Sequence, residues 1–101
     1  MIRFGRNARE NEELTLSMSG TDYWFHACDY PGSHVVLKGS PEPTQEDITE
    51  AARIAATRSK AKDLPIIKVI AARGTDVEKV KGTPLGTVSC TRYKIIKVSL
   101  Q

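Results

Sequence analysis

The sequence predicts an α+β fold, in which one long helix packs on a mixed, mostly antiparallel sheet of about six or seven strands. Two observations support this prediction. Short apolar and aromatic segments recur along the chain, separated by turn signals rich in Gly, Pro, Ser and Asp. One stretch, residues 44–62, instead has small apolar residues at helical spacing. The chain has 101 residues, the length of one domain, which we assign to residues 1–101.

Three strands are predicted before the helix. Polar and apolar residues alternate over 13–18, which indicates a half-buried strand. An aromatic strand over 23–27 and a short buried strand over 34–38 follow it. The turn between the last two contains Pro31 and Gly32, and we expect Gly32 to adopt a positive φ. Because the connections are short, the three strands should form an antiparallel meander.

The predicted helix begins after a loop at residues 39–43. Thr44 can cap its N-terminus. Its apolar face consists of small or medium side chains that would let it lie close to a sheet: Ile48, Ala51, Ala52, Ala55 and Ser59. The last turns, where cations suit the helix dipole, are assigned Arg53, Arg58, Lys60 and Lys62.

The remaining chain is predicted to form strands. A strongly apolar strand over 66–71 should lie inside the sheet, and shorter strands are predicted over 77–80, 87–90 and 95–100. No apolar run is long enough to span a membrane, and the N-terminus lacks the apolar region of a signal peptide. Two cysteines are too few for the disulfide framework of a secreted miniprotein, so we expect buried thiols in a reducing cytosol.

Positive charge is concentrated in the second half of the chain. Residues 1–51 have four Lys and Arg against nine Asp and Glu, whereas residues 52–101 have eleven against three. The formal net charge of +3 therefore conceals a basic half. Such a half suits a ligand with a phosphate backbone, but a solvated lysine-rich surface without a partner explains the charge equally well.

Residues 22–34 hold most of the side chains that could carry chemistry, and three hypotheses compete for them. In the first, His26, Cys28 and His34 are metal ligands, with Asp29 or Cys90 as a fourth, although their spacing matches no established zinc pattern. In the second, Cys28 is a nucleophile activated by one of the histidines and oriented by Asp29. Either would make the chain a small enzyme or a metal-binding protein.

The third hypothesis is an anion- and base-binding site. The turn at residues 31–34 can present successive backbone N–H groups and a hydroxyl to a phosphate, and His26 and His34 add donors. Trp24 or Tyr30 could stack on an unpaired base, although a strand aromatic usually belongs to the core. Of Trp24 and its neighbour Phe25, one should lie inside and the other at the surface or under the helix. The Asn- and Arg-rich segment 5–12 could contact phosphate or simply form a loop that positions the first strand.

Six motifs taken together resemble the NFACT-R domain, the RNA-binding domain of NFACT proteins, which include ribosome-quality-control factors. They are GRNARENEELT (5–15), DYWFHA (22–27), PGSHVV (31–36), AARIAA (51–56), SKAK (59–62) and KGTPLGTV (81–88). The match covers nearly the whole chain in the family's order. The chain departs from the pattern where Asp76 and Glu78 dilute a basic strand, and where Leu85 interrupts a Pro-Gly pair.

The resemblance implies a non-enzymatic domain without a cofactor or metal, which binds tRNA or rRNA in the cytoplasm. The large ribosomal subunit is a further expected partner, and the alternative is a ribosome-associated protein-docking module. Full-length members carry further domains, so we expect a stand-alone version, and the initiating Met1 favours a natural one over an excised one. The residues expected to bind RNA are Arg6, Asn7, Asn11, Asp22, Trp24, His26, Gly32, Ser33, His34, Arg58, Ser59, Lys60 and Lys62.

A geometric prediction follows from these assignments. The turn at residues 31–34 lies at one end of the sheet, and so does the basic segment 58–62 at the end of the helix. We expect the two ends to coincide, so that Lys60, Lys62 and His34 line one groove above the backbone donors of the turn.

Overall fold

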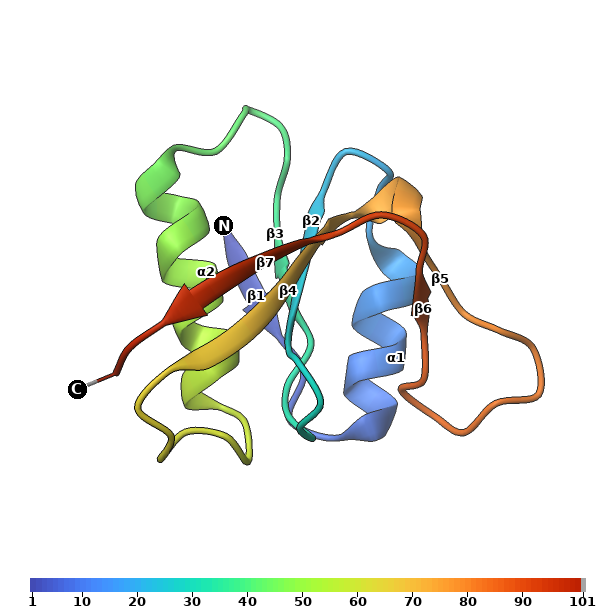
Figure 1. Ribbon diagram of the computed structural model, residues 1–101. Coiled ribbons are helices and arrows are strands. Elements are labelled where there is room, and N and C mark those ends of the chain that lie inside the picture. The colour runs from blue at the N-terminus through green and yellow to red at the C-terminus, as the bar shows by residue number, and fades with distance from the viewer. Residues whose placement is uncertain (101) are drawn as a thin grey trace.

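The computed structural model describes residues 1–100 and contains a five-stranded antiparallel sheet, a separate two-stranded sheet and two α-helices (Figure 1). Its elements are β1 (Ile2–Phe4), α1 (Ala8–Ser17), β2 (Tyr23–Ala27), β3 (Val35–Leu37), α2 (Gln45–Thr57), β4 (Ile67–Arg73), the 3₁₀ turn η1 (Gly74–Asp76), β5 (Val77–Glu78), β6 (Ser89–Cys90) and β7 (Lys94–Val98). The predicted α+β class is confirmed, with two helices in place of one.

Helix α1 corrects the prediction of a strand over 13–18. Asn7 caps the helix, because its side chain accepts a hydrogen bond of 2.9 Å from the backbone N–H of Glu10. The buried residues are spaced i, i+3 and i+4, as on one helix face: Asn11, Leu14 and Thr15. Leu14 is buried but Leu16 is 63% exposed, so the alternating apolar residues do not share one buried face, as they would in a strand.

The large sheet has the strand order β1-β3-β2-β4-β7. The unpredicted strand β1 takes the place beside β3, and the predicted meander is therefore wrong in its first member. Strand β4 lies inside the sheet between β2 and β7, as predicted. Phe25 and Trp24 alternate along β2 and both are buried, in separate clusters, because each face of the sheet is covered.

Helix α2 covers one face of the sheet (Figure 1). The predicted cap is present: Thr44 accepts from the N–H of Asp47 at 3.1 Å, and Asp47 accepts from the N–H of Thr44 at 3.0 Å. Four fully buried alanines face the sheet: Ala51, Ala52, Ala55 and Ala56. The helix ends at Thr57, so the basic segment 58–62 lies in the turn after it and not in its last turns.

Helix α1 and the small β5–β6 sheet cover the opposite face. There Leu14, Trp24, Val36 and Ala72 form a smaller core, against which residues of the β5–β6 region pack. The short strands predicted over 77–80 and 87–90 exist, but they pair with each other outside the main sheet. Within residues 1–100, no helix has the length and apolar character needed to cross a bilayer.

Candidate nucleic-acid interface

The turn between β2 and β3 is joined to the segment that follows α2. The backbone N–H of Ser33 donates to the carbonyl of Arg58 at 3.1 Å, and the N–H of Lys60 donates to the carbonyl of Pro31 at 2.9 Å. Gly32 and Ser59 form a β-bridge between the two segments. The predicted coincidence of the two ends is therefore confirmed.

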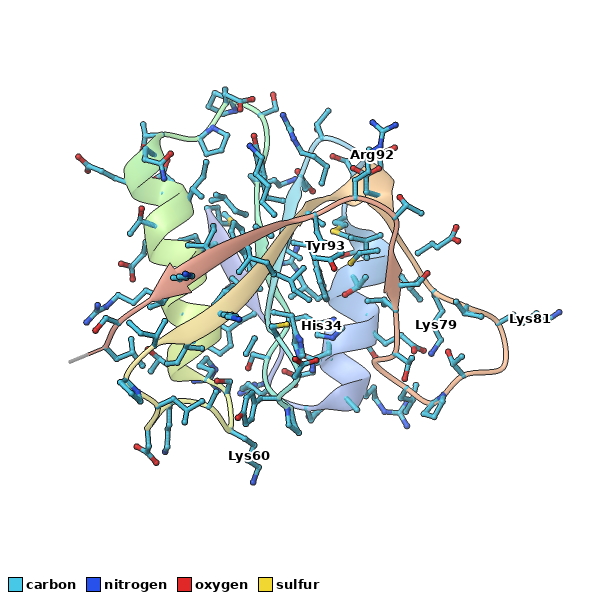
Figure 2. All side chains as sticks on the ribbon, in the orientation of Figure 1. His34, Lys60, Lys79, Lys81, Arg92 and Tyr93 are labelled. Atoms are coloured by element: carbon cyan, nitrogen blue, oxygen red, sulfur yellow. The ribbon has the colours of Figure 1, made fainter. Side chains whose placement is uncertain are left out.

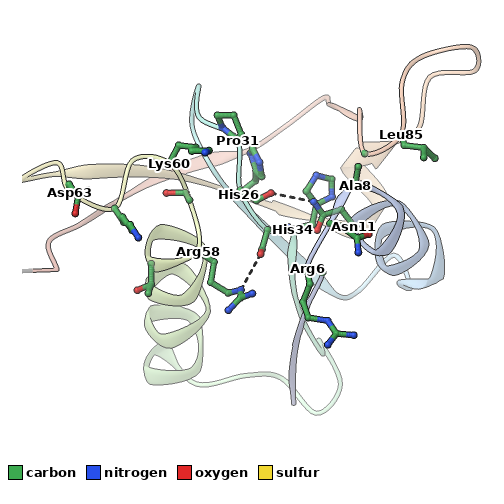
Figure 3. Close-up of a pocket in the computed structure, with 18 residues that line it drawn as sticks. Arg6, Ala8, Asn11, His26, Pro31, His34, Arg58, Lys60, Asp63 and Leu85 are labelled. Carbon is green, nitrogen blue, oxygen red and sulfur yellow. Dashed lines mark hydrogen bonds between the residues drawn. The ribbon is translucent and has the colours of Figure 1, made fainter.

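A groove of about 850 Å³ opens at this end of the sheet (Figure 3). It is lined by the two joined segments, by the residues that lead into α1, and by the loop before β6. Its charged side chains are Arg6, Arg58, Lys60, Lys62 and Asp63. Four cations and one carboxylate make the groove cationic, and Lys60, Lys62 and His34 all line it as predicted.

The cations of the groove differ in how they are held. The Arg58 guanidinium lies 4.1 Å from the centre of the Phe4 ring, and its Nε donates to Ser33 Oγ at 3.2 Å. Arg6 is engaged by Glu10 at 3.1 Å. Within residues 1–100, Arg58, Lys60 and Lys62 form no ion pair. These three cations are therefore free to meet an anionic ligand.

The role of Gly32 differs from the predicted one. In this turn the residue with positive φ is Asp29, at 64°, and not Gly32. A Cβ on Gly32 would lie 2.9 Å from the carbonyl oxygen of Arg58 and from Cα of Ser59. Glycine is required here because two backbone segments approach each other closely, so a substitution would disturb the fold and not only the turn.

Two of the backbone donors in the turn, the N–H groups of Ser33 and His34, are already occupied within the protein. The N–H of Ser33 is used by Arg58, and the N–H of His34 donates to Asn11 Oδ1 at 3.0 Å. The amide of Asn11 also donates to the carbonyl of Gly32 at 3.3 Å. Asn11 therefore fastens α1 to the turn.

The two histidines form a largely buried aromatic cluster in the wall of the groove. Their ring centres lie 5.2 Å apart, and Trp24 contacts both rings. His34 Nδ1 shares a hydrogen bond of 2.8 Å with Thr15 Oγ1. Burial, followed by the neighbouring His26, lowers the pKa of His34 to about 4, and burial also lowers the pKa of His26. Both rings are therefore uncharged at neutral pH and contribute no cation to the groove.

Three other residues expected to bind RNA serve the fold itself, as a helix cap, a buried hydrogen-bond acceptor and a core side chain. Asn7 caps α1 at the groove's edge. Asp22 is buried at the opposite end of the sheet, where it accepts from the N–H groups of Ser19 and Gly39 at 2.9 and 3.0 Å. Trp24 is 3% exposed and has no free face for a base. The structure therefore brings together most of the predicted residues but leaves Asp22 and Trp24 outside the groove.

The thiols fit neither the nucleophile nor the metal hypothesis. The sequence analysis expects both thiols to be buried, but Cys28 and Cys90 are only half-buried. Burial and the charge of Asp29 raise the pKa of the Cys28 thiol, whereas a nucleophilic cysteine needs a lowered pKa. Across the described residues 1–100, no three His, Cys, Asp or Glu side chains are grouped as metal ligands.

Part of the groove was not expected from the residue assignments. Leu85 and Gly86 form one rim, because the loop before β6 folds back toward α1 (Figure 3). Glu12 holds this loop: its carboxylate accepts from Gly86 N–H at 3.1 Å and from Lys79 Nζ at 2.7 Å. The KGTPLGTV motif is the one sequence signal that points to this loop.

The sheet with a helix on each face and its cationic groove define a small α+β domain of a kind suited to a polyanionic ligand. Over residues 2–94 the chain matches the family described as the NFACT protein RNA binding domain. The chain belongs to this family of RNA-binding domains, which confirms the resemblance found in the sequence.

Two curated relatives support the same family assignment. The chain is 37% identical over 100 residues to the Rqc2 homolog RqcH of Streptococcus pneumoniae, covering 98% of this chain and 18% of that protein. It is 44% identical over 89 residues to the Rqc2 homolog RqcH of Bacillus subtilis, covering 87% of this chain and 15% of that protein. The chain thus spans less than a fifth of the length of these curated relatives.

A solved structure shows the same fold. The C-terminal part of the fibronectin/fibrinogen-binding protein from Streptococcus suis matches with a TM-score of 0.90 at 36% sequence identity. The match covers 97% of this chain and 40% of that one.

Proposed function

We propose that this domain binds tRNA or rRNA through the groove between the β2–β3 turn and residues 58–62. It acts as a non-enzymatic module in ribosome quality control, in the cytoplasm and in contact with the large ribosomal subunit. Membership of the NFACT RNA-binding family and the names of the RqcH relatives support this proposal.

The observation that carries the proposal is a cluster at one end of the sheet of three cations that form no ion pair within residues 1–100. Arg58 is fixed by Phe4 and Ser33, whereas Lys60 and Lys62 are exposed beside it. A fixed guanidinium can bind a phosphate with little loss of side-chain entropy, and the two lysines add point charges along the backbone. The histidines stay uncharged, so binding should depend on salt far more than on pH near neutrality.

The first prediction concerns the two lysines. The Lys60→Ala/Lys62→Ala double variant should bind tRNA more weakly at every salt concentration, because two fewer phosphates are neutralised by the protein. The slope of log affinity against log salt should become shallower by about one for each lysine that no longer meets a phosphate. Fluorescence polarisation with labelled tRNA at several salt concentrations measures both quantities.

The matched control removes the same net charge elsewhere. Arg53 on the outer side of α2 and Lys97 on β7 are exposed and lie outside the groove. The Arg53→Ala/Lys97→Ala variant should keep nearly wild-type affinity. Equal decreases in affinity for the two double variants would show that net charge alone attracts RNA and would contradict the groove.

If binding to the ribosome survives nuclease treatment, the protein-docking alternative replaces the proposal.

A further inference from the structure

A second cavity, of about 550 Å³, lies at the other end of the sheet from the groove. It opens between the first turn of α2 and the strands β4 and β7. Strand β2 runs from Tyr23 beside this cavity to Ala27 near the groove, and β4 runs antiparallel to it. Arg92 lines this second cavity. Figure 2 shows Arg92 and Lys60 at opposite ends of the molecule. The RNA contacts proposed above therefore leave this cavity free.

The inner wall of the cavity is apolar and aromatic. It includes Phe25, Ala71 and Ile96, which belong to the sheet face covered by α2. The Arg73 guanidinium lies 4.1 Å from the centre of the Tyr23 ring and donates to the carbonyl of Thr21 at 2.8 Å. This wall is therefore held in place by contacts that exist without a ligand.

One carboxylate stabilises that wall from outside. The Tyr23 hydroxyl donates to Glu42 at 2.8 Å, and Glu42 also lies 3.9 Å from Arg73. A second carboxylate, Asp76, lines the cavity and accepts from the hydroxyl of Thr91 at 3.3 Å. Because Arg73 has Glu42 as an acidic partner, the cavity's cations without an ion pair among residues 1–100 are those of its rim.

The rim is the segment Arg92, Tyr93 and Lys94, directly before and at the start of β7. The Tyr93 side chain is 55% exposed, and a cation stands on either side of it in the chain. Neither Arg92 nor Lys94 takes part in an ion pair among residues 1–100. An exposed ring between unpaired cations beside an apolar cavity is suited to a stacked base whose phosphate reaches the cations.

We propose that this cavity binds one unpaired nucleotide of the RNA, with its base stacked on Tyr93 and its phosphate at Arg92 and Lys94. The inference rests on the proposed function, since the same RNA occupies the groove at the opposite end. The cavity volume falls within the range of about 300–1,000 Å³ that is usual for small-ligand sites. The nucleotide must be unpaired, because a base within a helix has both faces covered by its neighbours.

The test compares two RNA probes on wild-type and variant proteins. One probe is a blunt RNA duplex, and the other is the same duplex with a single-stranded 3′ extension of six nucleotides. Tyr93→Ala should weaken binding of the extended probe by about 5- to 150-fold, the range expected for removal of one base stack. The affinity for the blunt duplex should stay within about twofold. Tyr93→Phe should restore binding, because stacking needs the ring and not the hydroxyl.

The Lys60→Ala/Lys62→Ala variant separates this proposal from the proposed function. The lysine variant should weaken binding of both probes, whereas Tyr93→Ala should weaken binding of the extended probe alone. If the lysine variant loses affinity but Tyr93→Ala binds both probes like wild type, the second site is refuted and the groove stands. If Tyr93→Ala weakens binding of both probes equally, the second site is also refuted. If the wild-type protein binds neither probe, both proposals are refuted.

Discussion

The imidazole of His34 is 4% exposed and lies against Trp24, His26 and Thr15. In the anion-binding hypothesis from the sequence, His34 adds a donor for a phosphate beside the turn at residues 31–34. Burial makes the charged form costly, and the structure uses the ring to join β3 to α1. The same residue therefore forms part of the groove wall and adds no charge to it.

His34 should make stability depend on pH. Its pKa is lowered from 6.5 to about 4 in the folded protein, so between these values the unfolded chain binds the proton first. The stabilisation is complete above pH 6.5 and is lost as the pH falls toward 4, and the lowered pKa of His26 acts in the same direction. We expect the free energy of unfolding to be about 2 kcal/mol lower at pH 5.0 than at pH 7.5.

Urea unfolding followed by Trp24 fluorescence measures this difference. Most carboxylates titrate below pH 5, so they contribute little between the two conditions. The His34→Gln variant, which has no titratable ring, should show a clearly smaller difference. A variant with the same pH dependence as wild type would show that His34 is not responsible.

At the level of elements, the loop between β5 and β6 is positioned by one lysine. Lys79 Nζ donates to the carbonyls of Thr83 and Pro84 and pairs with the carboxylate of Glu12 on α1. The Lys79 and Glu12 side chains are only 18% and 19% exposed, so the pair is partly shielded from solvent. In Figure 2, Lys79 lies within the loop and Lys81 at its tip. The rim formed by Leu85 and Gly86 depends on this arrangement.

Removing the ammonium group should release the loop. In the Lys79→Ala variant we expect trypsin to cleave after Lys81 several times faster than in wild type, because protease access needs a mobile backbone. The Lys97→Ala variant also removes one exposed lysine and should leave this rate unchanged. Time courses followed by mass spectrometry measure the cleavage, and an unchanged rate in Lys79→Ala would contradict the positioning role.

At the scale of the whole molecule, the two faces of the sheet are unequal. The face under α2 buries twelve residues in its core cluster, including the four alanines that bring the helix close. The face under α1 has a cluster of only four buried residues. Because burial of apolar surface is the main stabilising term, the α1 side should open more readily than the α2 side.

Hydrogen exchange tests this difference. We expect amides of α1 and of β5–β6 to exchange at least tenfold faster than those of β2, β4 and α2. Since α1 carries Asn11 and the edge of the groove, an RNA ligand bound there should slow exchange in α1 more than in α2. Uniform protection over both helices in the free protein would contradict the unequal stability of the two faces.

Local patterning determined much of this fold. The aromatic segment of β2, the apolar segment of β4 and the Thr44 cap of α2 each depend on neighbouring residues, so a short window of sequence is enough to identify them. The sequence analysis also predicts that the basic residues 58–62 and the turn at 31–34 share one end of the sheet, and the structure confirms this. The motifs and their order along the chain are sufficient to identify the family.

Only the tertiary structure decided what α1 is and what the groove contains. Alternation over 13–18 is too short to distinguish a strand from a capped helix, and packing against Trp24 and Val36 selects the helix. The hydrogen bond from His34 to Asn11 joins residues 23 positions apart, and it removes a donor that the turn would offer in isolation. The pKa of His34, the close approach at Gly32 and the rim at Leu85 likewise arise from contacts between distant segments. Sequence periodicity encodes which face of an element is buried, but not which distant groups occupy its polar atoms.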